Sequence, residues 1–148
     1  MKVIVGNNPE LILKAQSIRH QVFVVEQQIP QALDLDGLDL KSHHVLVTDA
    51  DNLVATARLY IDDNGHAIMA RVAVLQAYRG LGIASKVVST VLEHARQLCA
   101  KVIEIHAHQY LRHYYERFGF KFIREVEIVG EHQLIEMRYD IAPSTHIQ

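Results

Sequence analysis

The sequence predicts an α/β fold in which a mixed, mostly antiparallel central sheet carries flanking helices. Three β-rich segments joined by turn signals occupy the middle of the chain, which is typical of an antiparallel meander. A strand–helix–strand unit follows over residues 72–107, and such a unit requires a right-handed parallel crossover. Two further segments near the C-terminal end alternate in polarity like strands. The 148 residues fit one domain with its own core, which we place at residues 1–142 with a flexible tail at 143–148.

The N-terminal part predicts a strand and then a helix. The short β-branched run at residues 3–5 is stopped by Gly6. Asn8 and Pro9 then form a helix start, with Asn as the N-cap and Pro at the first helical position. The helix should end near Gln27, because the residue before Pro30 resists helical geometry. Its predicted apolar face consists of Leu11, Ala15, Ile18, Val22 and Val25.

Residues 31–42 have no apolar period and contain Asp34, Asp36 and Asp39, so they predict an acidic loop. Such a loop either is an ordinary solvated segment or attracts a cationic ligand, and the pattern favours neither reading. Strands are predicted at 43–49, 53–61 and 66–74, with a hairpin turn at 62–65.

A helix is predicted after the glycine-containing turn at 79–82, with an apolar stripe that consists of Ile83, Val87, Val91, Ala95 and Leu98. A strand at 102–107 and a short helix at 110–118 follow, and Gly119 ends that helix. The last strands are expected at 120–129 and 132–140, where Ile135, Met137 and Tyr139 alternate onto one face.

Composition limits the class of function. The formal net charge of -2 argues against a nucleic-acid-binding protein, which carries a basic surface. Neither a signal peptide nor a membrane-spanning apolar run is found, so no membrane partner is expected. Cys99 is the single cysteine, which favours a reducing, cytoplasmic compartment, and its place at the end of an amphipathic helix predicts a core position.

The turn at residues 79–84 is the strongest candidate for a ligand site. A strand-like run leads into Arg79, Gly80 and Gly82, and a helical pattern begins directly afterwards. Such a junction points backbone N–H groups at whatever lies before the helix, which suits a phosphate. A P-loop is excluded because no Gly-Lys-Ser/Thr follows, and a dinucleotide-binding Rossmann variant is disfavoured by the antiparallel strands that precede the turn.

Two motifs resemble the GNAT family of N-acetyltransferases. The segment Arg79–Gly–Leu–Gly–Ile–Ala84 matches the family's Arg/Gln-x-x-Gly-x-Gly/Ala signature, and the run at 113–120 is similar to its Tyr-x-x-x-Gly-Phe segment. The strand order also resembles that fold over nearly the whole chain. The region at 19–27, the acidic loop and His43–His44 resemble a small bacterial subgroup of the family.

This resemblance implies acetyl-CoA as co-substrate and direct acetyl transfer to a primary amine of a small molecule or peptide. It implies that a backbone N–H of strand 72–74, that of Val74, polarises the thioester carbonyl, and that Tyr115 protonates the leaving thiolate. Tyr114 is then a core residue. It also aligns His108 with a residue that contacts the pantetheine arm. The predicted cofactor-binding residues are Val72, Ala73, Val74, Arg79, Gly80, Leu81, Gly82, Ile83, Ala84, Ser85, His108 and Tyr115.

The sequence leaves the general base and the acceptor open. The candidates for the base are Glu26, His43, His44, Glu131 and His132, and for each of them a plain surface role is the competing reading. We expect no metal ion: His106 and His108 share a strand face, but no third ligand has supporting spacing. A homodimer through the late strands is plausible. The rival function is a non-catalytic module that binds or senses acyl-CoA on the same fold.

Overall fold

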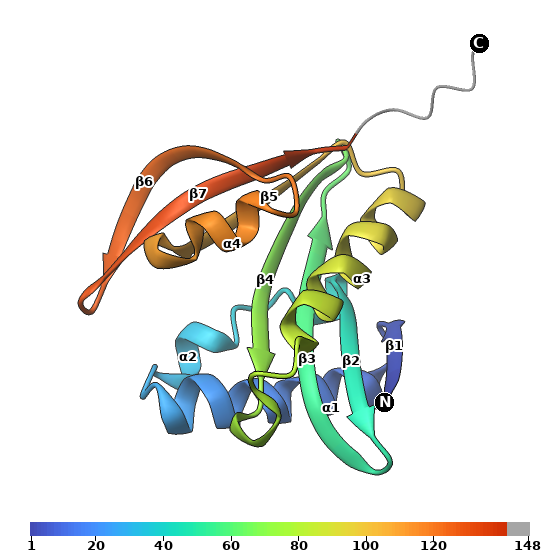
Figure 1. Cartoon of the computed structure of the whole chain (residues 1–148). Coiled ribbons are helices and arrows are strands. Elements are labelled where there is room, and N and C mark those ends of the chain that lie inside the picture. The colour runs from blue at the N-terminus through green and yellow to red at the C-terminus, as the bar shows by residue number, and fades with distance from the viewer. Residues whose placement is uncertain (142–148) are drawn as a thin grey trace. The chain divides into compact units, whose positions relative to one another are not determined.

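The computed structural model describes residues 1–141 and contains a seven-stranded sheet with the strand order β1-β2-β3-β4-β5-β7-β6 (Figure 1). The strands β4 and β5 pair in parallel, whereas β1–β2, β2–β3, β5–β7 and β6–β7 pair antiparallel. The predicted mixed, mostly antiparallel sheet and its parallel crossover are therefore confirmed. The predicted tail at 143–148, and residue 142 before it, lie outside the described residues.

The element bounds follow the predicted order closely. The strands are β1 Lys2–Gly6, β2 His43–Asp49, β3 Asn52–Ile61, β4 His66–Val74, β5 Val102–His108, β6 Lys121–Val129 and β7 His132–Asp140. The α-helices are α1 Pro9–Arg19, α2 Gln31–Asp34, α3 Ile83–Gln97 and α4 Arg112–Glu116. A π-helical segment His20–Glu26 continues α1, and 3₁₀ turns occur at Asp39–Lys41, Gln76–Tyr78 and Gln109–Leu111.

Contacts within the chain divide it into two compact units. The first unit contains residues 1–60 and 69–94, and the second contains residues 61–68 and the chain from residue 95 onward. The predicted single domain over residues 1–142 stays a prediction. No helix within residues 1–141 has the length and apolar character that are needed to cross a membrane.

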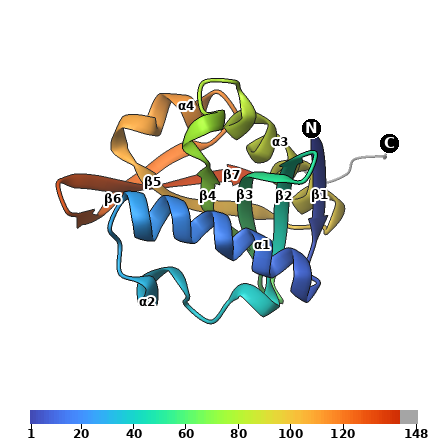
Figure 2. The same cartoon turned by 90° about the horizontal axis from the view of Figure 1, so that it is seen from below.

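In the first unit, α1 begins where the sequence predicts it. The Asn8 side-chain oxygen accepts a hydrogen bond from the Leu11 N–H at 2.9 Å, and Pro9 follows as the first helical residue. The helix packs its apolar face onto the strands, while α3 covers their opposite face (Figure 2). The core on the α1 side consists of Leu11, Ile18, Val22, Leu46 and Ala73.

The predicted face of this helix fails at its last member, because Val25 is exposed. The cause is a change of period after Arg19. In the π-helical segment the Gln27 N–H binds the Val22 carbonyl five residues back, so the 3.6-residue period no longer applies.

The acidic segment at 31–42 is not a solvated loop, and that reading is wrong for Asp34 and Asp39, which are buried. The fully buried guanidinium of Arg19 donates to Asp34 Oδ1 at 3.0 Å and to Asp39 Oδ1 at 2.7 Å. Arg58 on β3 donates to Asp39 Oδ1 at 3.1 Å and to Asp36 Oδ2 at 2.7 Å. We call these five side chains the arginine–aspartate network. It fastens the segment that contains α2 to α1 and β3.

In the second unit, Ile103 and Ile105 on β5 and Ile135 and Met137 on β7 are buried, and so is Phe120, whose ring packs against Tyr115 and Tyr139. The predicted alternation on β7 is confirmed for Ile135 and Met137, while Tyr139 is half-buried. The short helix α4 precedes β6.

Two positions in the second unit depend on backbone geometry. Gly119 has a φ of +108°, and a Cβ there would lie 2.8 Å from the Tyr139 ring, so the turn after α4 requires glycine. Cys99 is exposed rather than buried, because it lies beyond the end of α3 in a turn with a φ of +62°. Leu98 is also exposed, since it too follows the end of the helix.

The network predicts a large loss of stability when Asp39 is replaced. Asp39→Asn leaves two buried guanidinium groups short of a negative partner, which costs about 3–5 kcal/mol of unfolding free energy. Urea unfolding at pH 7 measures this loss. The control is Glu10→Gln, whose exposed ion pair with Lys14 contributes about 0.5 kcal/mol or less. A loss below about 1 kcal/mol for Asp39→Asn would contradict the role that we give to the network.

The same variant predicts a pH dependence. Burial alone would raise the pKa of Asp39, but the hydrogen bonds from Arg19, Gln16 and Arg58 hold that pKa well below its ordinary value. A depressed pKa contributes stability that is present above the unfolded value of about 3.9 and is lost as the pH falls through the lower folded value. The stability difference between wild type and Asp39→Asn should therefore shrink below about pH 4.

Candidate active site

The predicted phosphate turn lies between the end of β4 and the start of α3, in the first unit. Gly80 and Gly82 have φ values of +80° and +76°, and a Cβ built on either would meet nothing within 4 Å. Both glycines are therefore required by backbone conformation, and the space in front of them is open. The first α-helical hydrogen bond runs from the Lys86 N–H to the Gly82 carbonyl, so the amides of Ile83 and Ala84 precede the helical ladder.

The electrostatics of this turn favour an anion. The helix α3 has fifteen residues, and its first turn contains no acidic residue that would offset the positive end of its dipole. Leu81 is exposed and Ile83 is buried, so Ile83 contributes through its backbone rather than its side chain. The turn thus presents backbone N–H groups and a helix N-terminus to one open space, which is suitable for a pyrophosphate.

The structure joins two of the predicted site residues, Glu26 and Arg79. The two terminal nitrogens of Arg79 donate to the two carboxylate oxygens of Glu26 at 2.9 and 2.8 Å, and its Nε donates to the Val74 carbonyl at 3.0 Å. The guanidinium therefore connects the end of the π-helical segment to the end of β4. A carboxylate that is engaged in this way is less available as a base, so the geometry favours a structural role for Glu26.

His43 and His44 are consecutive residues on β2, so their side chains point to opposite faces of the sheet. His44 is fully buried, and its Nε2 lies 2.9 Å from the Asp39 carbonyl. Burial lowers its pKa. His43 Nδ1 lies 3.1 Å from His94 Nε2 on α3, where one ring must donate to the other. A soluble amine cannot reach His44 in this arrangement, whereas His43 keeps a partly exposed ring.

Tyr115 lies in the second unit, on α4. It is buried, and its ring packs edge-on against Phe120 and Tyr114. Burial, with a smaller contribution from Tyr114, raises the pKa of Tyr115 to about 12. The phenol therefore stays protonated at neutral pH, as a proton donor must. Tyr114, predicted as a core residue, is only half-buried, and its ring also packs on Phe118.

His108 and His132 come together at the facing ends of β5 and β7. Their rings lie 4.8 Å apart, and Tyr110 lies 5.2 Å from the His108 ring. Burial, and then the neighbouring His132, lowers the pKa of His108, and its buried Nδ1 lacks a hydrogen-bond partner. His106 binds Glu104 instead, so the two histidines of the His-x-His pattern have different partners.

A pocket of about 400 Å³ opens beside these rings. It lies in the second unit, and its walls carry a carboxylate, an imidazole, an exposed aromatic ring and two amides. The lining residues are Gln109, Tyr110, Glu131, His132 and Gln133. Two of the predicted base candidates, Glu131 and His132, therefore share one pocket.

Several features were outside the reach of the sequence pattern. The pairs Glu26–Arg79 and His43–His94 join residues that are 53 and 51 positions apart. No local period or motif marks such pairs. The pocket was also missed as a unit, although the candidates Glu131 and His132 indicated its position.

Comparison with known proteins gives consistent matches. The model of the acetyltransferase (GNAT) family matches residues 13–120. The chain is 36% identical over 114 residues to the protein ElaA of Escherichia coli (strain K12), covering 74% of each. It is 26% identical over 129 residues to the N-acetyltransferase YjcF of Bacillus subtilis (strain 168), covering 87% of this chain and 91% of that one.

A solved acyl-CoA N-acyltransferase from Pseudomonas aeruginosa has a TM-score of 0.85 with this structure at 27% identity, covering 94% of this chain and 99% of that one. The family match includes the whole turn at 79–84 and both motifs on which the resemblance was based. The chain belongs to the acetyltransferase (GNAT) family.

Proposed function

We propose that this protein transfers the acetyl group of acetyl-CoA directly to a primary amine. One observation carries the proposal: the open, glycine-containing turn at 79–82 that begins α3, in a chain of the GNAT family. Coenzyme A ends in a 3′-phosphoadenosine and a pyrophosphate, so it needs an anion site that lets backbone N–H groups approach closely. The turn supplies such a site without a blocking side chain.

The turn's anion affinity should come mainly from the backbone. Arg79 is neutralised by Glu26, so its charge adds little to the field at the turn. The α3 N-terminus supplies the equivalent of about half a positive charge. In this proposal the Val74 N–H at the end of β4 polarises the thioester carbonyl, and the segment Val72–Val74 lies alongside the pantetheine arm.

Acetyl transfer forms a C–N bond and breaks a C–S bond. The unprotonated amine nitrogen attacks the thioester carbon and forms a C–N bond. The tetrahedral intermediate then collapses, and the C–S bond breaks with both electrons going to sulfur. The Tyr115 phenol gives its proton to this thiolate and regains one from solvent, while a base accepts the proton from the amine nitrogen. The raised pKa of Tyr115 keeps the phenol protonated at neutral pH and makes it a weaker acid than a free tyrosine, so it can donate a proton but does not serve as the base.

We place the acceptor at the pocket beside β7. An amine that arrives as an ammonium ion is attracted by the Glu131 carboxylate and by the open face of Tyr110, and amide groups can orient its other polar atoms. His132 is the base candidate that this pocket supports, because its exposed imidazole lines the space where the amine would bind.

The experiment is an assay of acetyl transfer with two readouts. The protein is incubated with acetyl-CoA and a panel of polyamines, amino sugars, amino acids and short peptides. Released CoA thiol is measured, and mass spectrometry identifies the acetylated product. Amine-dependent thiol release with a product 42 Da heavier supports the proposal. Saturable CoA binding with no turnover across the panel would instead favour the non-catalytic acyl-CoA-binding module.

Replacement of Tyr115 predicts a loss of turnover with cofactor binding retained. Tyr115→Phe keeps the packing against Phe120 and removes the proton, so kcat should fall about 10²–10⁴-fold. The Kd for CoA should change little. Tyr114→Phe is the matched control, since it removes a hydroxyl from the neighbouring ring. Full activity in Tyr115→Phe would show that the phenol is not the acid.

The Glu26–Arg79 pair predicts that removing one of its charges increases the affinity for CoA. Glu26→Gln removes a negative charge beside the turn and frees the Arg79 guanidinium, so CoA should bind several-fold more tightly at low ionic strength. The gain should fade as salt is added. Calorimetric titration measures it, with Glu116→Gln, which breaks the similarly exposed pair with Arg112, as the control. Weaker CoA binding in Glu26→Gln would mean that the ion pair is needed to position Arg79 for CoA binding, and would contradict the prediction that it only neutralises the Arg79 charge.

A further inference from the structure

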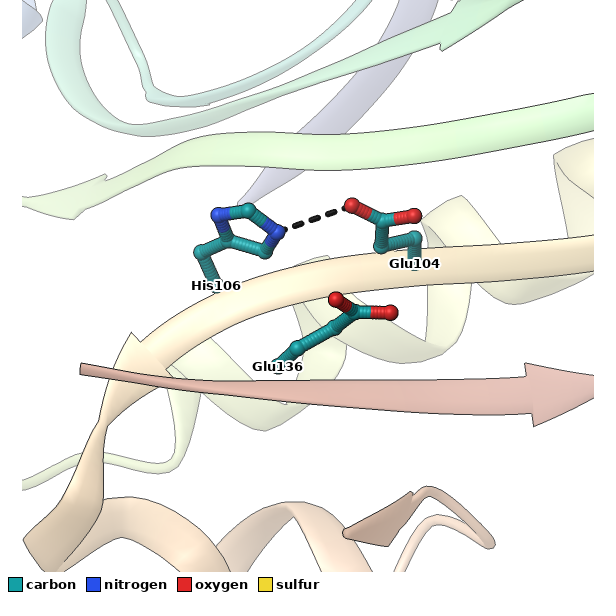
Figure 3. A group of neighbouring side chains, drawn as sticks. All are labelled: Glu104, His106 and Glu136. Carbon is teal, nitrogen blue, oxygen red and sulfur yellow. Dashed lines mark hydrogen bonds and ion pairs between the residues drawn. The ribbon is translucent and has the colours of Figure 1, made fainter. Parts of the chain in front are cut away.

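A cluster of metal-ligating side chains lies on one face of β5 and β7, in the second unit (Figure 3). Glu104 and His106 are two residues apart on β5, and Glu136 on β7 is the register partner of His106, so all three side chains share a face. One donor atom from each lies within 4.8 Å of the other two. His106 Nε2 lies 2.8 Å from Glu104 Oε2.

A second imidazole supports the same carboxylate. His66, at the start of β4, places its Nε2 2.9 Å from Glu104 Oε1. Glu104 thus has one imidazole on each oxygen, from two different strands. Carboxylates and imidazoles that hold a metal are oriented in this way by outer hydrogen bonds, and such partners affect metal affinity strongly.

Two arginines now balance the charge of the carboxylates. Arg138 Nε lies 3.0 Å from Glu136 Oε2, and its Nη2 lies 3.8 Å from Glu104 Oε1. Arg124 Nε lies 3.3 Å from Glu136 Oε1. The Arg124 and Arg138 side chains are 60% and 38% exposed, whereas the Glu136 side chain is only 7% exposed. The carboxylate is therefore fixed, and its cationic partners are long side chains that can move into solvent.

We propose that Glu104, His106 and Glu136 bind a divalent transition-metal ion such as Zn²⁺, with His66 orienting Glu104. One imidazole nitrogen and two carboxylate oxygens form a donor set that suits Zn²⁺, and three protein ligands leave its fourth position open to water. The ion's two positive charges replace those of the two arginines. Nothing in acetyl transfer requires this ion, so the site is independent of the proposed function.

The geometry requires a modest contraction. Bonds of about 2.0–2.1 Å in a tetrahedral site place ligand atoms about 3.3 Å apart. The donor atoms now lie within 4.8 Å of one another, so side-chain rotation has to bring them closer. The His106 side chain is 42% exposed and can turn toward the carboxylates of Glu104 and Glu136, which are only 16% and 7% exposed.

The test uses the full chain after dialysis against a chelator. Zn²⁺ is titrated by calorimetry, and Co²⁺ by its visible absorption, which reports the coordination geometry. We expect one ion per chain. His106→Ala should weaken binding at least about 10-fold, and His66→Ala should weaken it about 10-fold or more through Glu104. Thermal unfolding in a chelator checks that each variant is folded.

Arg124→Ala gives the sharpest result. If Arg124 competes with the metal ion for the Glu136 carboxylate, removing its charge should tighten metal binding several-fold. A cluster that serves only as a charge network would bind no ion with or without Arg124.

Three control variants remove other side chains in the described residues that can bind a metal ion. They are His94→Ala at the His43–His94 pair, His113→Ala at the exposed His113–Glu116 pair, and Cys99→Ser. All three should bind the ion as the wild type does. The proposal is overturned by an absence of saturable binding, by wild-type affinity in His106→Ala, or by loss of binding in any of the three controls.

Discussion

The buried guanidinium of Arg19 is the group on which the first unit depends. A charge removed from water costs several kcal/mol unless hydrogen bonds replace its hydration. Hydrogen bonds from three nitrogens of Arg19 replace this hydration. Its Nε and Nη1 donate to the Asp34 and Asp39 carboxylates, and its Nη2 donates to the Asp34 carbonyl at 2.9 Å. These contacts fix the segment at 31–42, in which Leu33, Leu35 and Leu40 are exposed and so contribute little to a core. Arg71 extends the same arrangement. It has a left-handed φ of +57° within β4, and its side chain donates hydrogen bonds to the Leu33 carbonyl and to Asp36.

This network changes what the acidic segment does. Three aspartates, at 34, 36 and 39, face three arginines, at 19, 58 and 71, so formal charges of −3 and +3 cancel within the protein. The segment therefore projects little negative potential toward a cationic acceptor, although attraction of a cationic ligand was one of the two readings that its composition left open. Glu131, in the second unit, by contrast keeps an exposed carboxylate in the wall of a pocket. Burial and pairing, rather than the number of acidic residues, decide which carboxylates are available to a ligand.

The sequence predicted the elements well because their signals are local. The N-cap at Asn8, the glycine turn at 79–82 and the alternation on β7 each depend on neighbours within a few residues, and the structure has the first two and, for Ile135 and Met137, the third. The exposed Val25 shows the limit of such signals, since the π-helical hydrogen bonds that shift it leave no mark in the apolar period. The contacts of Asp39 and Glu26 could not be predicted for a different reason. Asp39 pairs with Arg19 and Glu26 pairs with Arg79, and a partner 20 or 53 residues away is not visible to a pattern along the chain.

The arginine–carboxylate pairs of this protein differ chiefly in burial. Burial decides which ion pairs are costly to break and which a ligand can displace. Arg19 is fully buried, so breaking its pairs would strand an uncompensated charge. Arg79 and Glu26 are 43% and 27% exposed, and Arg124 is 60% exposed. Exposed pairs contribute only about 0–1 kcal/mol, because water solvates each partner once they separate. An anion at the turn can therefore compete with the Arg79–Glu26 pair at small cost, whereas a cation at Glu136, whose side chain is only 7% exposed, must replace the charge of Arg124. An arginine–carboxylate pair therefore stabilises the first unit where it is buried, and a ligand can displace it where it is exposed to solvent.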